Sequence, residues 1–197
     1  VATIADTKGP EMRLGMFANN KVTLHEGDEF VLTTEEVVGD VHKAHVNYAG
    51  LPKEVHVGSM ILLADGLLSL EVTAIEGVEI HTKVVHGGEV SNRKRVACPG
   101  IELKLPFLSE QDKADILFAV KNDMDYIAAS FVQKADDVLA IRKILEDAGS
   151  SIGIISKIEN EAGVHHIDEI INVSDGVMIA RGDLGVEIPS EVVPLVQ

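Results

Sequence analysis

The sequence has few of the features that mark secreted or membrane proteins. Cys98 is the single cysteine among 197 residues, which excludes a disulfide within the chain and favours a reducing compartment. No apolar run approaches the roughly 20 residues that a membrane-spanning helix requires, and the first residues do not resemble a signal peptide. We therefore expect a cytoplasmic protein with no membrane partner.

Aromatic residues and positive charge are also scarce. Aromatic residues make up 4% of the chain and Trp is absent, so the core must be aliphatic. Lys and Arg number 17 against 32 Asp and Glu, which gives a formal net charge of −15. This charge argues against nucleic acid as a partner. It does not exclude an anionic substrate, because a metal ion or a few cationic side chains can reverse the charge within a site.

Two sequence patterns divide the chain. Between residues 11 and 97, short alternating apolar runs separated by turn residues predict a small all-β domain. After Pro99-Gly100, helical and apolar segments alternate about every 25 residues, which is typical of parallel βα units. The expected helices cover residues 108–122, 134–149 and 162–175, and the expected strands 125–132, 152–158 and 176–182. Ser109 is the expected N-cap of the first helix, and Gly149 is the expected end of the second.

A further strand is expected over residues 1–6, ahead of the β-rich segment. The chain therefore predicts an α/β domain built from residues 1–10 and 98–197, with the β domain of residues 11–97 inserted into it. Because the chain opens on a strand and stops within a helix-like segment, we expect a piece of a longer protein.

Charged residues stand at the ends of two apolar runs. Lys157 and Glu159 close the first, and alternate residues of a strand project to the same face. Asp183 follows the next run, 24 residues and one βα unit later, so the two carboxylates should leave adjacent strand ends. Paired carboxylates suit Mg²⁺, and a lysine beside them can stabilise a phosphoryl group or an enolate. A salt bridge that caps the sheet explains the same spacing, which leaves both readings open.

The opening strand also ends in polar residues. Asp6 and Thr7 offer oxygen ligands for a cation, while Lys8 and Arg13 offer contacts to phosphate. Gly9 permits a close backbone approach or an unusual dihedral angle. By itself, however, a charged turn after a strand is more often an ordinary loop.

Three blocks in this order closely resemble the pyruvate kinase family. They are "DTKGPEMRLG" (6–15), "IISKIENEAGVHHIDEI" (154–170) and "VSDGVMIARGDLGVEIP" (173–189), and the segments that link them resemble the family too. The resemblance implies phosphoryl transfer from phosphoenolpyruvate to ADP, giving pyruvate and ATP in glycolysis. It also implies a partial (β/α)8 TIM barrel that carries strands 3 to 6, with the inserted β domain acting as a mobile lid.

The resemblance assigns roles to the charged strand ends. Lys157 matches the residue that stabilises the transition state at the transferring phosphoryl group. Glu159 and Asp183 match the ligands of Mg²⁺ or Mn²⁺. Gly182 and Asp183 match positions that contact the substrate.

The resemblance also implies a K⁺ site and a nucleotide site. Asp6 and Thr7 match two K⁺ ligands, and Glu11 points to a parent enzyme that requires K⁺. Arg13 matches a contact to the nucleotide phosphates, and Lys94 matches a lid residue that reaches ATP. In the unusually basic segment 92–95, a neighbouring arginine could take the place of Lys94.

Two further expectations limit the assignment. A metal-dependent aldolase or lyase acting on pyruvate-like enolates would use the same carboxylates, but a carbon–carbon lyase needs no nucleotide clamp. On the family template the chain supplies only the middle of a parent that is usually a homotetramer. We therefore expect the isolated chain to be inactive in phosphoryl transfer.

Overall fold

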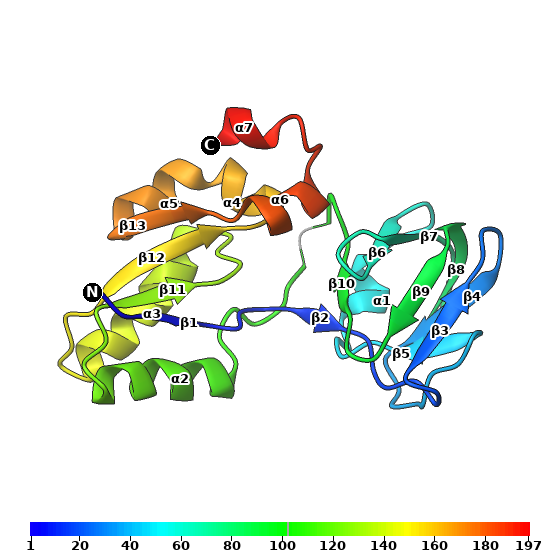
Figure 1. Ribbon diagram of the computed structural model, residues 1–197, viewed down its shortest axis with the longest axis horizontal. Coiled ribbons are helices and arrows are strands. Elements are labelled where there is room, and N and C mark those ends of the chain that lie inside the picture. The colour runs from blue at the N-terminus through cyan, green and yellow to red at the C-terminus, as the bar shows by residue number, and fades with distance from the viewer. Residues whose placement is uncertain (102) are drawn as a thin grey trace. The chain divides into compact units, whose positions relative to one another are not determined.

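The chain folds into two compact units. The computed structural model describes residues 1–101 and 103–197. Unit 1 combines Val1–Pro10 with Pro106–Gln197, and unit 2 consists of Glu11–Leu105 (Figure 1). Unit 1 is thus made from both ends of the chain, and unit 2 is inserted between them.

Unit 1 is built on a parallel sheet of four strands in the order β1-β11-β12-β13. All three pairings are parallel. The strands are β1 (Ile4–Asp6), β11 (Tyr126–Ala129), β12 (Gly153–Ile158) and β13 (Gly176–Ile179). Neighbours in the sheet follow one another in the chain, with helices between them, as in a (β/α)8 barrel. The predicted fold class, an α/β partial barrel with an inserted all-β part, is confirmed.

Six helices accompany this sheet in the described part of unit 1. They are α2 (Glu110–Lys121), α3 (Ala135–Asp147), α4 (Glu161–His165), α5 (Ile167–Val173), α6 (Arg181–Glu187) and α7 (Val193–Val196). The predicted caps are confirmed where the sequence marked them: the Ser109 side chain accepts from the Asp112 backbone N–H, and Gly149 follows α3 with φ +67°.

Three predicted element boundaries are wrong. The strand expected over residues 125–132 ends at Ala129, ahead of a turn at Ser130 and Phe131. The single helix expected over residues 162–175 is divided at His166, whose ring nitrogen Nδ1 lies 2.9 Å from the carbonyl oxygen of Gln133. The strand expected over residues 176–182 ends at Ile179, and Arg181 begins α6. Gly182 and Asp183 therefore lie in the first turn of a helix rather than on a strand.

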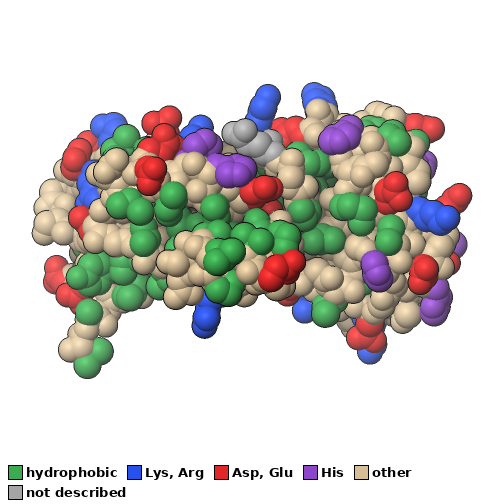
Figure 2. All heavy atoms as spheres, turned by 90° about the horizontal axis from the view of Figure 1, so that it is seen from above, with side chains coloured by type: hydrophobic (Ala, Val, Ile, Leu, Met, Phe, Trp, Pro, Cys, Tyr) green, Lys and Arg blue, Asp and Glu red, His purple; other side chains and the backbone are tan. Residues whose placement is uncertain are grey.

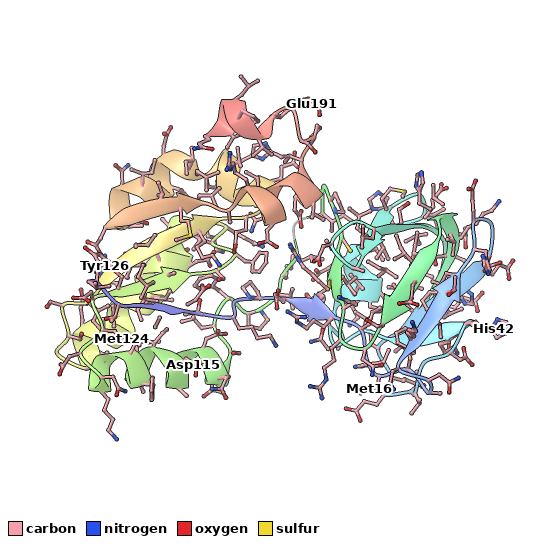
Figure 3. All side chains as sticks on the ribbon, viewed as in Figure 1. Met16, His42, Asp115, Met124, Tyr126 and Glu191 are labelled. Carbon is pink, nitrogen blue, oxygen red and sulfur yellow. The ribbon has the colours of Figure 1, made fainter. Side chains whose placement is uncertain are left out.

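The helices cover one face of the sheet. The buried core on that face unites residues of the strands with residues of α2, α3 and α5: Ile127, Ala129, Ile154, Ile158, Ile116, Val138, Ile141 and Ile170. The other face is open, and Ile4, Tyr126 and Met178 there are 47%, 36% and 39% exposed. Figure 3 labels Tyr126 at the amino end of β11. Lys157 is paired in register with Met178 and so projects from this open face.

Unit 2 is a β structure whose core is mainly aliphatic and also buries Phe17 and Phe30. A seven-stranded sheet has the order β2-β10-β6-β7-β8-β4-β5, and β3 pairs with β9. The elements are β2 (Met12–Arg13), β3 (Lys21–Leu24), β4 (Glu29–Thr33), β5 (Lys43–His45), α1 (Leu51–Glu54), β6 (Met60–Leu63), β7 (Leu68–Glu76), β8 (Glu79–His86), β9 (Gly88–Ser91) and β10 (Arg95–Ala97). Cys98, Ile101, Leu103 and Leu105 also pack on this core. That residues 11–97 act as a lid stays a prediction.

The surface agrees with the composition. Figure 2 shows acidic side chains distributed over one face, with hydrophobic and fewer basic ones between them. None of the helices formed by residues 1–101 and 103–197 has the length and apolar character that crossing a membrane requires.

Glu54 joins two segments of unit 2. Its Oε1 accepts a hydrogen bond from Tyr48 Oη at 2.7 Å, and its Oε2 accepts one from the backbone N–H of Lys104 at 3.1 Å. Burial, the hydrogen bond and the negative charge of Glu54 together raise the pKa of Tyr48 to about 12. This carboxylate therefore ties α1 to the segment that leaves unit 2.

Replacing Glu54 by Gln should lower the pKa of Tyr48 toward its ordinary value of 10.0, because the negative charge is lost while burial remains. The chain has 2 tyrosines, so a Tyr126→Phe background makes Tyr48 the only one, and ultraviolet titration of the phenolate then reports it alone. Glu110→Gln, which removes an exposed partner of Lys113 in unit 1, is the matched control. A Tyr48 pKa that Glu54→Gln leaves unchanged would contradict this origin of the shift.

Candidate active site

The carboxyl ends of three strands of unit 1 meet at the ammonium group of Lys157. Its Nζ lies 2.9 Å from Ser130 Oγ, 3.1 Å from Glu159 Oε1 and 3.2 Å from Asp6 Oδ1. Asp6 ends β1, Ser130 follows β11, and Glu159 follows β12. The structure thus brings together three of the residues singled out in the sequence, and adds Ser130.

Glu159 is a buried carboxylate. Its side chain is 1% exposed, and its second oxygen, Oε2, accepts a hydrogen bond from the backbone N–H of Phe131 at 2.7 Å. Burial raises the pKa of Glu159 and so does the negative charge of nearby Asp183, while the Phe131 N–H and Lys157 oppose the rise. The net shift is upward, so this carboxylate gains from any additional positive charge placed beside it.

Lys157 supplies such a charge. Burial lowers its pKa, but the negative charges of Glu159 and Asp6 raise it, and the net shift is upward. The group is therefore an ammonium ion at neutral pH. Its side chain is 15% exposed, so a small part of it remains open to a ligand from the uncovered face of the sheet.

The turn after β11 is strained. Phe131 has φ +57°, in the left-handed region that residues with a Cβ seldom adopt. Such a conformation costs about 1–3 kcal/mol and persists where surrounding contacts enforce it. In this conformation the Phe131 N–H points at the Glu159 carboxylate, and the hydroxyl of the preceding Ser130 accepts a hydrogen bond from Lys157. Neither contribution could be identified from the letters "ASFV".

Asp6 and Thr7 differ in what they offer a cation. The Asp6 side chain is 63% exposed, and its Oδ1 accepts from Ser130 Oγ at 3.0 Å. Thr7 is buried, and its hydroxyl donates to the carbonyl of Ala128 at 3.4 Å and accepts from the backbone N–H of Ser130 at 3.1 Å. The Thr7 hydroxyl thus already makes hydrogen bonds with β11 and the residue that follows it, while the Asp6 carboxylate faces solvent.

Gly182 and Asp183 lie in the first turn of α6, directly after β13, which is the strand next to β12. The space beside Gly182 is open, since a Cβ there would meet no atom within 4 Å. Asp183 is half-buried and close enough to Glu159 to raise its pKa. In the described chain, no three His, Cys, Asp or Glu side chains are arranged to hold a metal. The carboxylates of Glu159 and Asp183 are hard oxygen donors, and such a pair suits Mg²⁺, which commonly takes only one or two protein carboxylates.

The candidate nucleotide contacts lie together in unit 2. Arg13 is in β2, and the next residue, Leu14, donates its N–H to the carbonyl oxygen of Lys94 at 2.9 Å. The guanidinium of Arg13 is oriented by Glu11 Oε2, at 2.7 Å from Nη2, and by the carbonyl of Arg93, at 2.9 Å from Nη1. Lys94 and Arg93 are exposed while Arg95 is 8% exposed, so the first two are the side chains available to a ligand.

Removing the ammonium group of Lys157 should show how much it stabilises the buried carboxylate of Glu159. Lys157→Met should lower the free energy of unfolding by about 3 kcal/mol at neutral pH, because it leaves a buried carboxylate without its cation. The folded-state pKa of Glu159 should rise further, so this loss should shrink as the pH falls from that raised pKa toward the ordinary glutamate value of 4.5, below which Glu159 is protonated in both states. Urea titration at several pH values, each against the wild type, measures the difference.

The double variant Lys157→Met/Glu159→Gln provides the control. Compared with Glu159→Gln alone, it should show a much smaller penalty for losing the lysine, with little dependence on pH. An equal loss from Lys157→Met at acidic and neutral pH would mean that Glu159 does not carry the interaction.

Comparisons with known proteins identify a family whose members match the whole chain. A family model described as pyruvate kinase, barrel domain, matches residues 1–197. The pyruvate kinase of Geobacillus stearothermophilus is 51% identical over 200 residues, covering 100% of this chain and 34% of that protein. That of Clostridium acetobutylicum is 49% identical over 199 residues, covering 100% of this chain and 42% of that protein.

A solved structure agrees in fold. The crystal structure of a pyruvate kinase from Cryptosporidium parvum superposes with a TM-score of 0.93 at 41% identity, covering 100% of this chain and 42% of that one. The chain therefore spans between 34% and 42% of the length of these relatives. Its residues 1–197 belong to the pyruvate kinase family.

Proposed function

We propose that the protein containing this chain transfers the phosphoryl group of phosphoenolpyruvate to ADP and releases pyruvate and ATP. The observation that carries the proposal is the Lys157 ammonium group, held by Ser130, Glu159 and Asp6 at the carboxyl ends of parallel strands. Phosphoryl transfer depends mainly on positioning and on the stabilisation of negative charge, and a fixed ammonium group does both.

The family resemblance assigns each residue its role, and the surroundings of each residue are compatible with that role. Lys157 stabilises the negative charge that develops on the transferring phosphoryl group. Glu159 and Asp183 hold Mg²⁺ or Mn²⁺, which when bound supplies further positive charge for the phosphoryl oxygens. Gly182, with open space beside it at the start of α6, lets the substrate approach the backbone closely.

The remaining predicted residues bind a monovalent cation and the nucleotide. Asp6 and Thr7 contribute to a K⁺ site, in which the exposed Asp6 carboxylate is the stronger candidate because the Thr7 hydroxyl is already bonded to β11. Arg13, oriented by Glu11, contacts the phosphates of ADP, and Lys94 lies on the neighbouring chain segment for the same purpose. We place this enzyme in glycolysis in the cytoplasm, as a homotetramer.

The test of the reaction is pyruvate formation from phosphoenolpyruvate, ADP, Mg²⁺ and K⁺ by the full-length protein. Lys157→Met should lower kcat by about a thousandfold, since a preorganised charge is lost from the transition state. Lys113→Met, which removes an exposed lysine of the same unit, should leave kcat unchanged. The isolated chain of residues 1–197 should be no faster than Lys157→Met. Pyruvate formation that needs no ADP would point instead to a lyase.

Divalent metal binding can be tested without turnover. Titration of the chain with Mn²⁺, followed by the electron paramagnetic resonance of free Mn²⁺, should show one site that Glu159→Gln or Asp183→Asn weakens at least about tenfold, because each removes a carboxylate ligand. The control is Glu191→Gln, an exposed acidic residue labelled in Figure 3. Equal Mn²⁺ affinity in all the variants would contradict the assignment of this carboxylate pair.

A further inference from the structure

Asp112 is a fully buried carboxylate that does more than cap its helix. It lies in the first turn of α2 and is 0% exposed. Its Oδ2 completes the capping box, accepting from the backbone N–H of Ser109 at 3.0 Å and from Ser109 Oγ at 2.5 Å. Its Oδ1 accepts from the backbone N–H groups of Lys8 at 3.0 Å and Gly9 at 3.2 Å. The second oxygen thus serves the loop after β1, over 100 residues away in sequence.

This loop is pressed against the strand end that carries Ser130. Gly9 has φ +71°, and a Cβ built on it would lie 2.6 Å from the carbonyl oxygen and 3.1 Å from the Cβ of Ser130. Only glycine fits such an approach, and only glycine adopts this φ without strain. The position of the Lys8–Gly9 backbone therefore limits where Ser130 can lie.

Ser130 in turn contacts the candidate active site through both its hydroxyl and its backbone N–H. Its Oγ lies 2.9 Å from Lys157 Nζ and donates to Asp6 Oδ1 at 3.0 Å, while its backbone N–H donates to Thr7 Oγ1 at 3.1 Å. A continuous series of contacts joins the Asp112 carboxylate, the Gly9 backbone, Ser130 and the ammonium group of Lys157.

We propose that Asp112 is a positioning residue for Lys157. By holding the Lys8–Gly9 backbone against Ser130, its Oδ1 keeps the Ser130 hydroxyl on the ammonium group. The relevance of this to catalysis rests on the proposed function, in which Lys157 meets the phosphoryl group. The contacts themselves require neither substrate nor metal.

A purely structural role gives a different expectation. If Asp112 only capped α2, its loss would resemble the loss of the other member of the capping box, Ser109. Ser109→Ala removes the hydroxyl contacts but leaves Oδ1 on the loop. Both substitutions should destabilise the fold through the lost cap, and Asp112→Ala should do so more, because buried N–H groups then lose their acceptor. Only Asp112→Ala should disturb Ser130 and Lys157.

The experiment compares Asp112→Ala with Ser109→Ala by NMR in the full-length protein, without substrate. One readout is hydrogen exchange at the Ser130 amide, and the other is the side-chain ammonium signal of Lys157, whose protons exchange slowly with water while they are hydrogen-bonded. Asp112→Ala should accelerate Ser130 exchange at least about tenfold beyond the change in global stability and broaden the Lys157 signal. Ser109→Ala should leave both at the wild-type values after the same correction.

A second pair tests the same contact from the other side and does not depend on whether Asp112→Ala folds. Gly9→Ala adds a methyl group against Ser130, whereas Gly149→Ala adds one at a similar φ, +67°, where nothing lies within 4 Å. Both are strained, but only Gly9→Ala should change the Ser130 and Lys157 signals. The proposal is overturned if Gly9→Ala matches Gly149→Ala, or if Asp112→Ala matches Ser109→Ala.

These readouts separate the proposal from the proposed reaction. Altered Ser130 and Lys157 signals in a protein that transfers no phosphoryl group would support the positioning role of Asp112 and show that this role does not serve phosphoryl transfer. Unaltered signals in an active kinase would overturn the positioning role and leave the reaction intact.

Discussion

Burying the carboxylate of Glu159 is the constraint that organises unit 1. A buried negative charge is stable only when cations and hydrogen-bond donors surround it, and here it has one of each, from Lys157 and from the Phe131 backbone. The Lys157 ammonium group needs acceptors of its own, which come from Ser130 and Asp6. Stabilising the Glu159 carboxylate thus involves residues at the ends of three strands. The same arrangement places the Lys157 ammonium group on the uncovered side of the sheet.

How much of this could be predicted depends on the range of the interaction. Strand alternation predicts that Lys157 and Glu159 project together, because it is a local property of residues two apart in sequence, and their charged atoms lie 3.1 Å apart. The caps at Ser109 and Gly149 were predicted for the same reason. The strand ends also indicated Asp6, Thr7, Arg13 and Asp183. The family resemblance added Gly182 and Lys94, and the roles of all these residues stay predictions.

Interactions set by strand register could not be predicted from the sequence. Ser130 meets Asp6 across 124 positions, and Asp112 meets Lys8 across 104, so no local pattern relates them. The predicted strand that carries Met178 is too long, because Ala180 continues the apolar run while the chain begins a helix at Arg181. The strained φ of Phe131 is likewise imposed by its surroundings, since nothing in the residue favours it.

The insertion of unit 2 bears on the kinetics of folding. β1 pairs with β11 although Ile4 and Tyr126 are separated by the whole of unit 2, and bringing distant segments of an unfolded chain together costs loop-closure entropy and slows folding. Within unit 2, however, β2 and β10 pair antiparallel, with Arg13 opposite Arg95, so its entry and exit lie side by side once it has folded. A folded unit 2 acts as a short covalent bridge between β1 and the rest of the sheet. If unit 2 forms first, the loop that must close to pair β1 with β11 is therefore shorter, and the entropic cost of assembling the strand end that carries Asp6 is lower.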